Sequence, residues 1–191
     1  MAQADPHSPG ATVTVWDPFV RVFHWTVVLA FVVAYLVEDP HVVHVWAGYV
    51  IAAMLIARVI WGLVGSKHAR FSDFLYAPST AVAYVRNLLR MHGKRYLGHS
   101  PAGGYTIVAL IVMLALTGIA GLIIYGGEKN AGPLAGMVAK QTAEQFEEVH
   151  EVLANITIAL ILVHISAVLF ASFAHRENLA RSMVTGTKRA D

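Results

Sequence analysis

The chain has 191 residues, enough for one domain, and it is 57% hydrophobic and only 14% charged. This composition, with a mean hydropathy of +0.57, is typical of an integral membrane protein and argues against a soluble globular one. The lack of cysteine in the sequence excludes disulfides, thiolate-bound metal clusters and any cofactor attached through cysteine.

Four apolar stretches follow one another along the chain, each close to or above the ~20 residues that a helix needs to cross a bilayer. They lie at about residues 20–37, 42–64, 105–125 and 149–173. Residues 1–18 have no apolar run typical of a cleavable signal, so we expect the first stretch to stay in the mature protein. The pattern predicts an all-α fold, an integral membrane four-helix bundle formed by residues 1–191 as a single domain.

The connection between the second and third stretches contains a further helical pattern, at about residues 78–91. A proline and a serine begin it, and valines and leucines recur at helical spacing against Arg86 and Arg90. This pattern predicts a short amphipathic helix on the inner membrane surface, in contact with lipid. An ordinary solvated connector is the alternative.

The basic residues indicate which side of the membrane each connection faces. Four spans place both termini on one side, and twelve of the fourteen lysines and arginines belong to that side. Only Lys129 and Lys140 belong to the other. By the positive-inside rule we expect both termini to be cytoplasmic. The pI of about 9.0 therefore reflects membrane topology, and we expect no nucleic-acid partner.

The two connections predicted to face outward, residues 38–41 and 126–148, are acidic. With the first turn of the fourth stretch, they carry Glu38, Asp39, Glu128, Glu144, Glu147, Glu148 and Glu151. Seven carboxylates against two lysines would attract a basic protein and repel a small anion.

Four histidines lie in or at the ends of the apolar stretches. His150 and His164 are fourteen residues apart. At ~100° and ~1.5 Å per residue, they share one face of a helix and lie ~21 Å apart along it. His24 lies near the inner end of the first stretch and matches the depth of His164. His44 lies near the outer end of the second and matches the depth of His150.

These paired histidines suggest metal ligation. An ionisable side chain in a span is costly and is expected to have a partner, and neutral imidazole is a common axial ligand of haem iron. One histidine near a helix end is more often interfacial or hydrogen-bonded, but two pairs matched in depth favour two haems. A structural zinc needs four ligands at one point, which pairs ~20 Å apart cannot supply. At the outer site, His41 is an alternative to His44.

Glycines and arginines near these histidines fit the same interpretation. Gly48 lies one turn from His44, where a larger side chain would crowd a porphyrin, and Gly118 and Gly121 would give the third helix a thin wall; tight helix packing is the alternative. Arg58 lies on the face of His44 but ~21 Å deeper. It is predicted to neutralise a propionate of the inner haem, with Arg21 as a second candidate, unless it extends to the interface.

The remaining histidines lie in segments predicted to be aqueous or interfacial, and we expect none of them to be a ligand. They are His7, His68, His92, His99 and His175. His99 is also a candidate proton donor at an inner quinone pocket.

At these residues the chain resembles the bacterial cytochrome b561 family, including the b-type cytochrome subunits of nickel–iron hydrogenases. The matching motifs are Arg21-Val22-Phe23-His24-Trp25, His44-Val45-Trp46-Ala47-Gly48, and His150-Glu151-Val152-Leu153-Ala154-Asn155 with His164 after it. The resemblance extends from Trp16 to about Arg189. It implies two non-covalent b haems in a four-helix bundle, with axial ligand pairs His24 with His164 and His44 with His150.

The resemblance also implies electron transfer in a bacterial inner (plasma) membrane. We expect electrons to pass from a periplasmic redox partner, such as a cytochrome c or a hydrogenase-like protein, to quinone. The chain would then be the electron-transfer subunit of a quinone-reducing oxidoreductase. The alternatives are a stand-alone superoxide:ubiquinone oxidoreductase and a membrane anchor of a redox complex.

Overall fold

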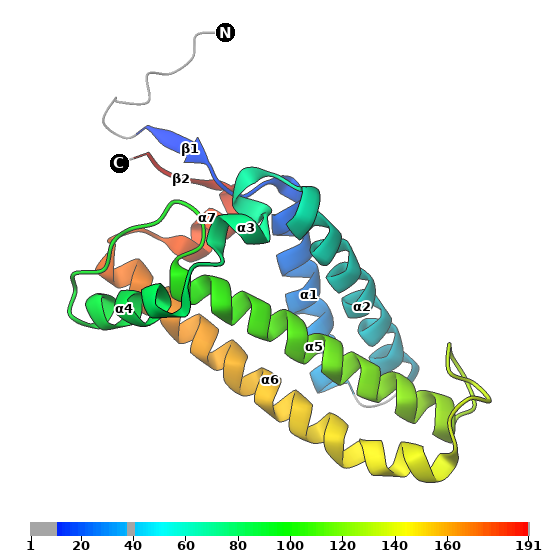
Figure 1. Cartoon of the computed structure of the whole chain (residues 1–191). Helices are drawn as coiled ribbons and strands as arrows, with labels where there is room; N and C mark the ends of the chain where they lie inside the picture. The colour runs from blue at the N-terminus through cyan, green and yellow to red at the C-terminus, as the bar shows by residue number, and fades with distance from the viewer. Residues whose placement is uncertain (1–10, 38–40, 191) are drawn as a thin grey trace, which may run out of the picture. The chain divides into compact units, whose positions relative to one another are not determined.

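A computed structural model describes residues 11–37 and 41–190, and the chain is mostly helical (75%). Four long helices dominate it (Figure 1). They are α1 (Pro18–Leu36), α2 (His41–Val64), α5 (Pro101–Glu128) and α6 (Lys140–Ala174). Each is long and apolar enough to cross a membrane, and only 6% to 28% of the residues in their most apolar windows are buried. The four predicted apolar stretches are thus confirmed as helices.

The connection between α5 and α6 is shorter than the sequence predicted. Residues 126–128 belong to α5 and residues 140–148 to α6, so the expected 126–148 loop was wrong at both ends. The early part of α6 is rich in glutamate and glutamine, which favour helix, and Lys140 and Glu144 form an ion pair one turn apart. An apolar run marks only the part of a helix in lipid, and it misses such a polar extension. The predicted 38–41 turn lies outside the described residues except for His41.

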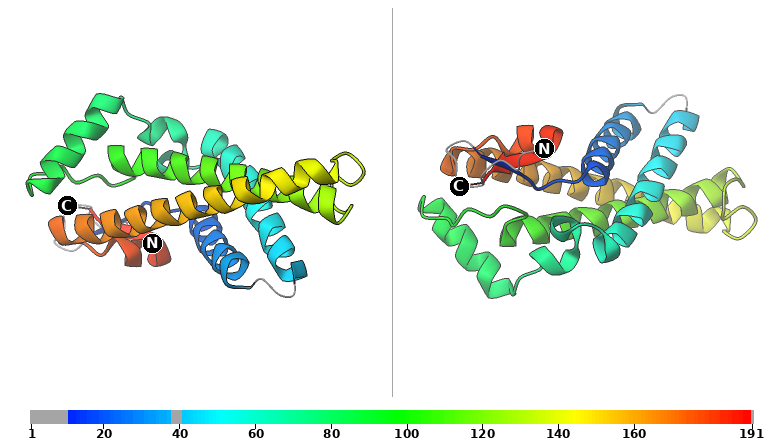
Figure 2. Two further views of the ribbon diagram at one scale, coloured as in Figure 1. Left: turned by 90° about the horizontal axis from the view of Figure 1, so that it is seen from below. Right: turned by 90° about the horizontal axis from the view of Figure 1, so that it is seen from above.

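The expectation of an all-α fold needs one correction. Strand β1 (Thr12–Thr14) pairs antiparallel with β2 (Thr187–Arg189) (Figure 1). Three-residue strands are too short to give a periodic pattern, and their pairing depends on contacts across the whole chain. The backbone nitrogens of Val15 and Trp16 donate to the carbonyl of Gly186. Both views of Figure 2 accordingly place the C-terminal segment beside the segment that leads into α1.

Four short helices complete the fold. They are η1 (Lys67–Ala69), α3 (Phe71–Phe74), α4 (Pro78–Leu89) and α7 (Leu179–Thr185). The helix predicted at 78–91 is confirmed as α4, which ends two residues earlier. It buries Tyr84 and Leu88 and exposes Val82, Val85 and Leu89. Its contact with a membrane surface stays a prediction.

The chain forms two compact units, each with residues from all four long helices. Unit 1 comprises the residues up to Trp25, Arg58–Ile107 and those from Val163 on; unit 2 comprises Thr26–Ala57 and Val108–Leu162. Unit 1 contains the strands and short helices, and its core includes Val15, Trp16, Val20 and Ala69. Each unit contains one of the two predicted histidine pairs.

Candidate functional site

The outer pair, His44 from α2 and His150 from α6, lies in unit 2, where the two rings contact each other edge to face. Their centroids are 6.1 Å apart and their planes are inclined by 63°. A metal–imidazole bond is about 2 Å long and each ring adds about 1 Å, so two imidazoles on one metal have centroids roughly 6 Å apart. The observed separation fits one metal ion between the rings.

A backbone carbonyl engages one nitrogen of each ring. The Nδ1 of His44 lies 2.7 Å from the carbonyl oxygen of Ala34, and the Nδ1 of His150 lies 3.0 Å from that of Thr117. A carbonyl only accepts, so each Nδ1 carries the proton and donates it. Each Nε2 then keeps its lone pair for a metal, an arrangement common among ligating histidines.

Glycines near this pair leave room for a flat cofactor. A Cβ at Gly48 or at Gly118 would meet no atom of the described chain within 4 Å. A Cβ at Gly121 would lie 3.2 Å from Cε1 of His150, so glycine there allows the ring to approach α5. The crowding of a porphyrin by a larger side chain at Gly48 stays a prediction.

His41, the alternative ligand, lies three residues before His44 on the same helix. Its ring is 6.1 Å from that of His44 and 6.2 Å from that of Tyr125, and its side chain is exposed. In the described part of the chain no ring contact joins it to His150. The geometry therefore favours His44 at this site.

The inner pair, His24 from α1 and His164 from α6, lies in unit 1, where both residues are half-buried. His24 packs edge-on against Trp25, and within the described residues its ring makes no contact with His164. The Nδ1 of His24 is buried and has no hydrogen-bond partner within those residues. The structure thus places both residues in one unit, near enough for their side chains to interact electrostatically, without the ring contact of the outer pair.

Arg58 is among the most deeply buried polar residues of unit 1, at 2% exposure. Its guanidinium lies 5.1 Å from the ring centroid of Phe71 and 6.0 Å from that of Phe23. Its Nη1 has no hydrogen-bond partner in the described chain. This burial argues against the alternative that Arg58 extends to the interface, and a buried cation of this kind is costly unless an anion pairs with it.

Arg21, the second arginine candidate, is already held by α7. Its Nη1 donates to the carbonyl of Val184 over 2.8 Å, and its buried Nε has no partner among the described residues. One donor is therefore still available for an anionic group.

Sequence reasoning missed the environment of His99, which it placed in an aqueous or interfacial segment. The ring packs between Trp16 and Phe74, with centroids 4.6 Å away on each side, and its Nδ1 is buried. Burial, together with the positive charges of Arg58 and Lys188, lowers the pKa of His99 to about 3. The ring is therefore neutral at physiological pH. His99 lies within a segment rich in turn-forming residues, Gly98-His99-Ser100-Pro101-Ala102-Gly103-Gly104, and this local sequence gave no signal of the packing.

The histidines outside the two pairs and His99 have contacts of their own where the structure describes them. His68 pairs with Asp73, and His92 bonds the carbonyl of Arg90. His175 lines a small polar cavity of about 60 Å³ in unit 1, and His7 lies outside the described residues. Across residues 11–37 and 41–190, no cluster of three metal-ligating side chains is found.

Beside this polar cavity lies an ion-paired cluster that the sequence did not reveal. Arg95 donates to both carboxylate oxygens of Glu177, at 3.1 and 2.7 Å, and the backbone nitrogen of Arg189 donates to the same carboxylate. The buried Lys188 donates to the carbonyl of Tyr96. The partners are 12 to 92 residues apart in sequence, so no local motif could predict them.

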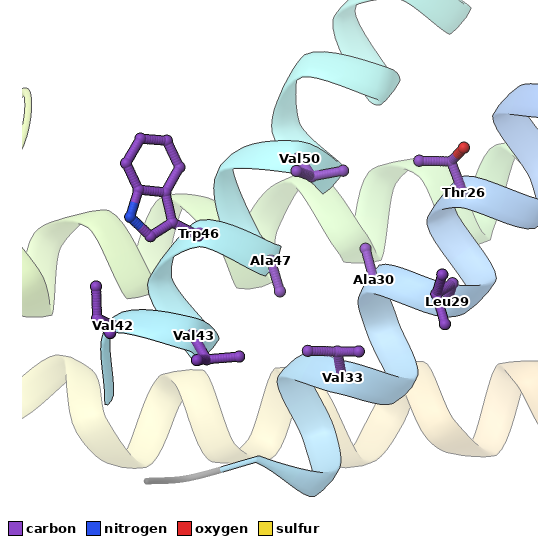
Figure 3. A pocket seen from close by; sticks show the side chains of 9 residues that line it. All are labelled: Thr26, Leu29, Ala30, Val33, Val42, Val43, Trp46, Ala47 and Val50. Carbon is purple, nitrogen blue, oxygen red and sulfur yellow. The ribbon is translucent and has the colours of Figure 1, made fainter. Parts of the chain in front are cut away.

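Unit 2 also contains an apolar groove of about 390 Å³ between α1 and α2 (Figure 3). It is lined by Thr26, Leu29, Ala30, Val33, Val42, Val43, Trp46, Ala47 and Val50. None of these side chains is a metal ligand or titrates near neutral pH, so the groove contributes no ligand to a redox site.

Known proteins are similar to this chain over the residues that carry both histidine pairs. A family model described as prokaryotic cytochrome b561 matches residues 15–186. The chain is 23% identical to a probable Ni/Fe-hydrogenase B-type cytochrome subunit of Rhizobium leguminosarum bv. viciae, over 97% of this chain and 94% of the relative. It is 24% identical to a protein of the same description from Azotobacter vinelandii, over 91% and 87%. A third, from Cupriavidus necator, is 23% identical over 90% and 85%.

No solved structure matches the chain. The family model nevertheless covers nearly all of the described residues, including all four histidines of the two pairs. The chain belongs to the prokaryotic cytochrome b561 family.

Proposed function

We propose that the chain is a di-haem membrane electron carrier that passes electrons from a periplasmic redox partner to membrane quinone. Family membership indicates a multi-pass membrane cytochrome that binds haem b and takes part in electron transfer. The observation that carries the proposal is the pairing of His44 and His150, whose centroids are 6.1 Å apart with both Nδ1 atoms held by carbonyls.

In this proposal each haem is held by two histidines. His44 and His150 form the outer site, and His24 and His164 form the inner one. Gly48 leaves space for the porphyrin at the outer site, and Arg58 and Arg21 offer donors to propionates at the inner site. A b haem with two imidazoles carries one electron and has no free iron position for oxygen.

The residues of the chain hold and orient this cofactor. Hydrogen bonds from Nδ1 to the carbonyls of Ala34 and Thr117 fix the imidazole planes and make the ligands more basic. The surrounding apolar helices exclude water, which helps to set the potential. The buried charge of Arg58 stabilises an anion near the inner histidines.

An acidic surface on unit 2 supports a basic periplasmic partner. Four carboxylates of α6, those of Glu144, Glu147, Glu148 and Glu151, are exposed. Between residues 126 and 151 the basic residues are Lys129 and Lys140. Such a surface would steer a basic protein and repel superoxide, which favours a docking subunit over a superoxide oxidase. The names of the relatives, probable hydrogenase cytochrome subunits, also favour a place in a redox complex.

The proposed location is the bacterial inner membrane, with one domain, both termini cytoplasmic and α4 on the inner surface. Pairing of β1 with β2 supports termini on the same side, since a strand pair cannot form across a bilayer. The exposed Val82, Val85 and Leu89 of α4 support insertion of its apolar face into the lipid surface.

Haem content after loss of one ligand tests the proposal. The purified protein should contain two b haems per chain, and His150→Ala and His164→Ala should each retain one, with distinct absorption spectra and midpoint potentials. His92→Ala, at an exposed loop position, is the matched control and should retain both. A colourless wild-type protein, or two haems in either ligand variant, would refute the proposed sites.

A further inference from the structure

A buried basic region of unit 1 has donors that no anion accepts: the charge of the Asp17 carboxylate acts on Arg58, but no hydrogen bond joins the two among the described residues. Arg58 is 2% exposed and Lys188 is 6% exposed. Two carboxylates of this unit are already engaged: Asp17 accepts hydrogen bonds from Trp61 and Ser66, and Glu177 binds Arg95. Within the described chain, the Nη1 of Arg58 and the Nδ1 of His99 therefore have no partner.

Aromatic rings connect these two unpaired groups. The guanidinium of Arg58 lies over Phe71, Phe71 contacts Phe74 at 5.8 Å, and Phe74 contacts His99 at 4.6 Å. Phe23, which precedes His24 in the sequence, lies on another side of Arg58. The unpaired groups thus adjoin the segment that carries an inner histidine.

The charge of this region favours an anionic ligand. Burial is the main cause that lowers the pKa of His99 to about 3, and the positive charges of Arg58 and Lys188 add to it, so both cations act on this ring. A neutral imidazole still donates one hydrogen bond. A guanidinium supplies full charge and several fixed donors, which suit a planar carboxylate.

We propose that Arg58 and His99 together bind one propionate carboxylate of the haem at the inner histidine pair. Arg58 supplies the charge, and the Nδ1–H of His99 supplies a second hydrogen bond. This inference rests on the proposed function, because it needs a haem between His24 and His164. It assigns a haem-binding role to a residue before α5, far in sequence from both ligands.

Two variants of the full-length protein separate hydrogen bonding from packing. His99→Phe keeps an aromatic ring between Trp16 and Phe74 but has no donor, whereas His99→Gln keeps an N–H donor. Each is produced in cells fed δ-aminolevulinate labelled with ¹³C at its carboxyl, which labels the propionates. Readouts are haem content, the redox-difference infrared spectrum and the midpoint potential of each haem.

In His99→Phe we expect both haems to be retained, one labelled carboxylate band to shift, and the midpoint potential of the inner haem to fall. The fall follows because a carboxylate without this donor stabilises the ferric state more strongly. His99→Gln should restore the band towards that of the wild type, and the potential of the outer haem should stay unchanged in both.

An unchanged band and potential in His99→Phe would overturn the inference and leave the proposed function intact. Should His99→Phe lose the inner haem, retention of that haem by His99→Gln with a wild-type band supports the inference, and its loss from both variants overturns it. A wild-type protein without haem contradicts the proposed function itself.

Discussion

Units 1 and 2 each contain one histidine pair, but the two pairs differ in ring contact and in the groups that surround them. In unit 2 the rings of His44 and His150 are 6.1 Å apart, and main-chain carbonyls of Ala34 and Thr117 hold them. In unit 1 the rings of the pair make no contact within the described residues, and the notable features are buried charges such as Arg58.

The two units thus illustrate two ways of building a cofactor site, one based on backbone hydrogen bonds and one on side-chain donors. Backbone hydrogen bonds orient the outer ligands within apolar helices and need no charged side chain. The inner site instead has donors supplied by Arg58 and His99, which still lack an acceptor within the described residues. We infer that the outer pair is set mainly by helix geometry, and that the inner pair depends on electrostatic pairing with the cofactor.

Gly48→Leu should have the largest effect and should act on the outer site alone. The space beside Gly48 contains no atom of the described chain within 4 Å of an added Cβ, so the first carbon of the new side chain meets no protein atom. A leucine there would occupy the space proposed for the porphyrin. We expect nearly complete loss of the outer haem and retention of the inner one, measured by haem content and redox titration.

Ala53→Leu, at an exposed position on the same helix, is the matched control and should keep both haems. Two haems with unchanged spectra in Gly48→Leu would show that Gly48 borders no porphyrin.

The sequence predicted those parts of the fold that depend on local pattern. Apolar runs long enough to span a bilayer located the four long helices, and the spacing from His150 to His164 follows from helix periodicity alone. Pro78 and the apolar spacing after it likewise predicted α4. In each case the physical cause lies within a few turns of one helix.

What the sequence could not predict depends on contacts between distant segments. The pairing of β1 with β2 and the bonds of Glu177 to Arg95 join residues far apart in the chain. The polar start of α6 has no apolar run to mark it. His99 lies in a turn-rich segment that reads as solvated, and only tertiary packing places it between Trp16 and Phe74.

Glu177→Gln should have an intermediate effect, confined to unit 1. Burial alone would raise the pKa of Glu177. Hydrogen bonds from Arg95 and Arg189 and the charges of Arg95 and Lys188 together lower this pKa by more than burial raises it, so the net shift is downward. The carboxylate therefore stabilises the fold above its unfolded pKa, and this stabilisation is lost as pH falls through the lower folded pKa. Loss of charge-assisted hydrogen bonds should cost roughly 2 kcal/mol.

Amide hydrogen exchange of β2 and α7 measures this effect. Protection against exchange, measured relative to the intrinsic rate at each pH, should be lower in the variant at neutral pH, and in the wild type it should fall only under acid conditions. Glu151→Gln, at an exposed position of unit 2, should leave exchange in β2 unchanged. Equal protection of β2 in Glu177→Gln and the wild type would show that this ion pair adds nothing to unit 1.

Glu144→Gln with Glu148→Gln should have the smallest effect and should act on unit 2 alone. Both side chains are exposed, so each contributes little to stability, but together they add to the field that steers a basic partner. We expect electron exchange with a basic cytochrome c to slow roughly fivefold at low ionic strength, with little difference at high salt, where charges are screened. Lys129→Gln removes an opposing charge and should raise the rate, which a non-electrostatic encounter would not do.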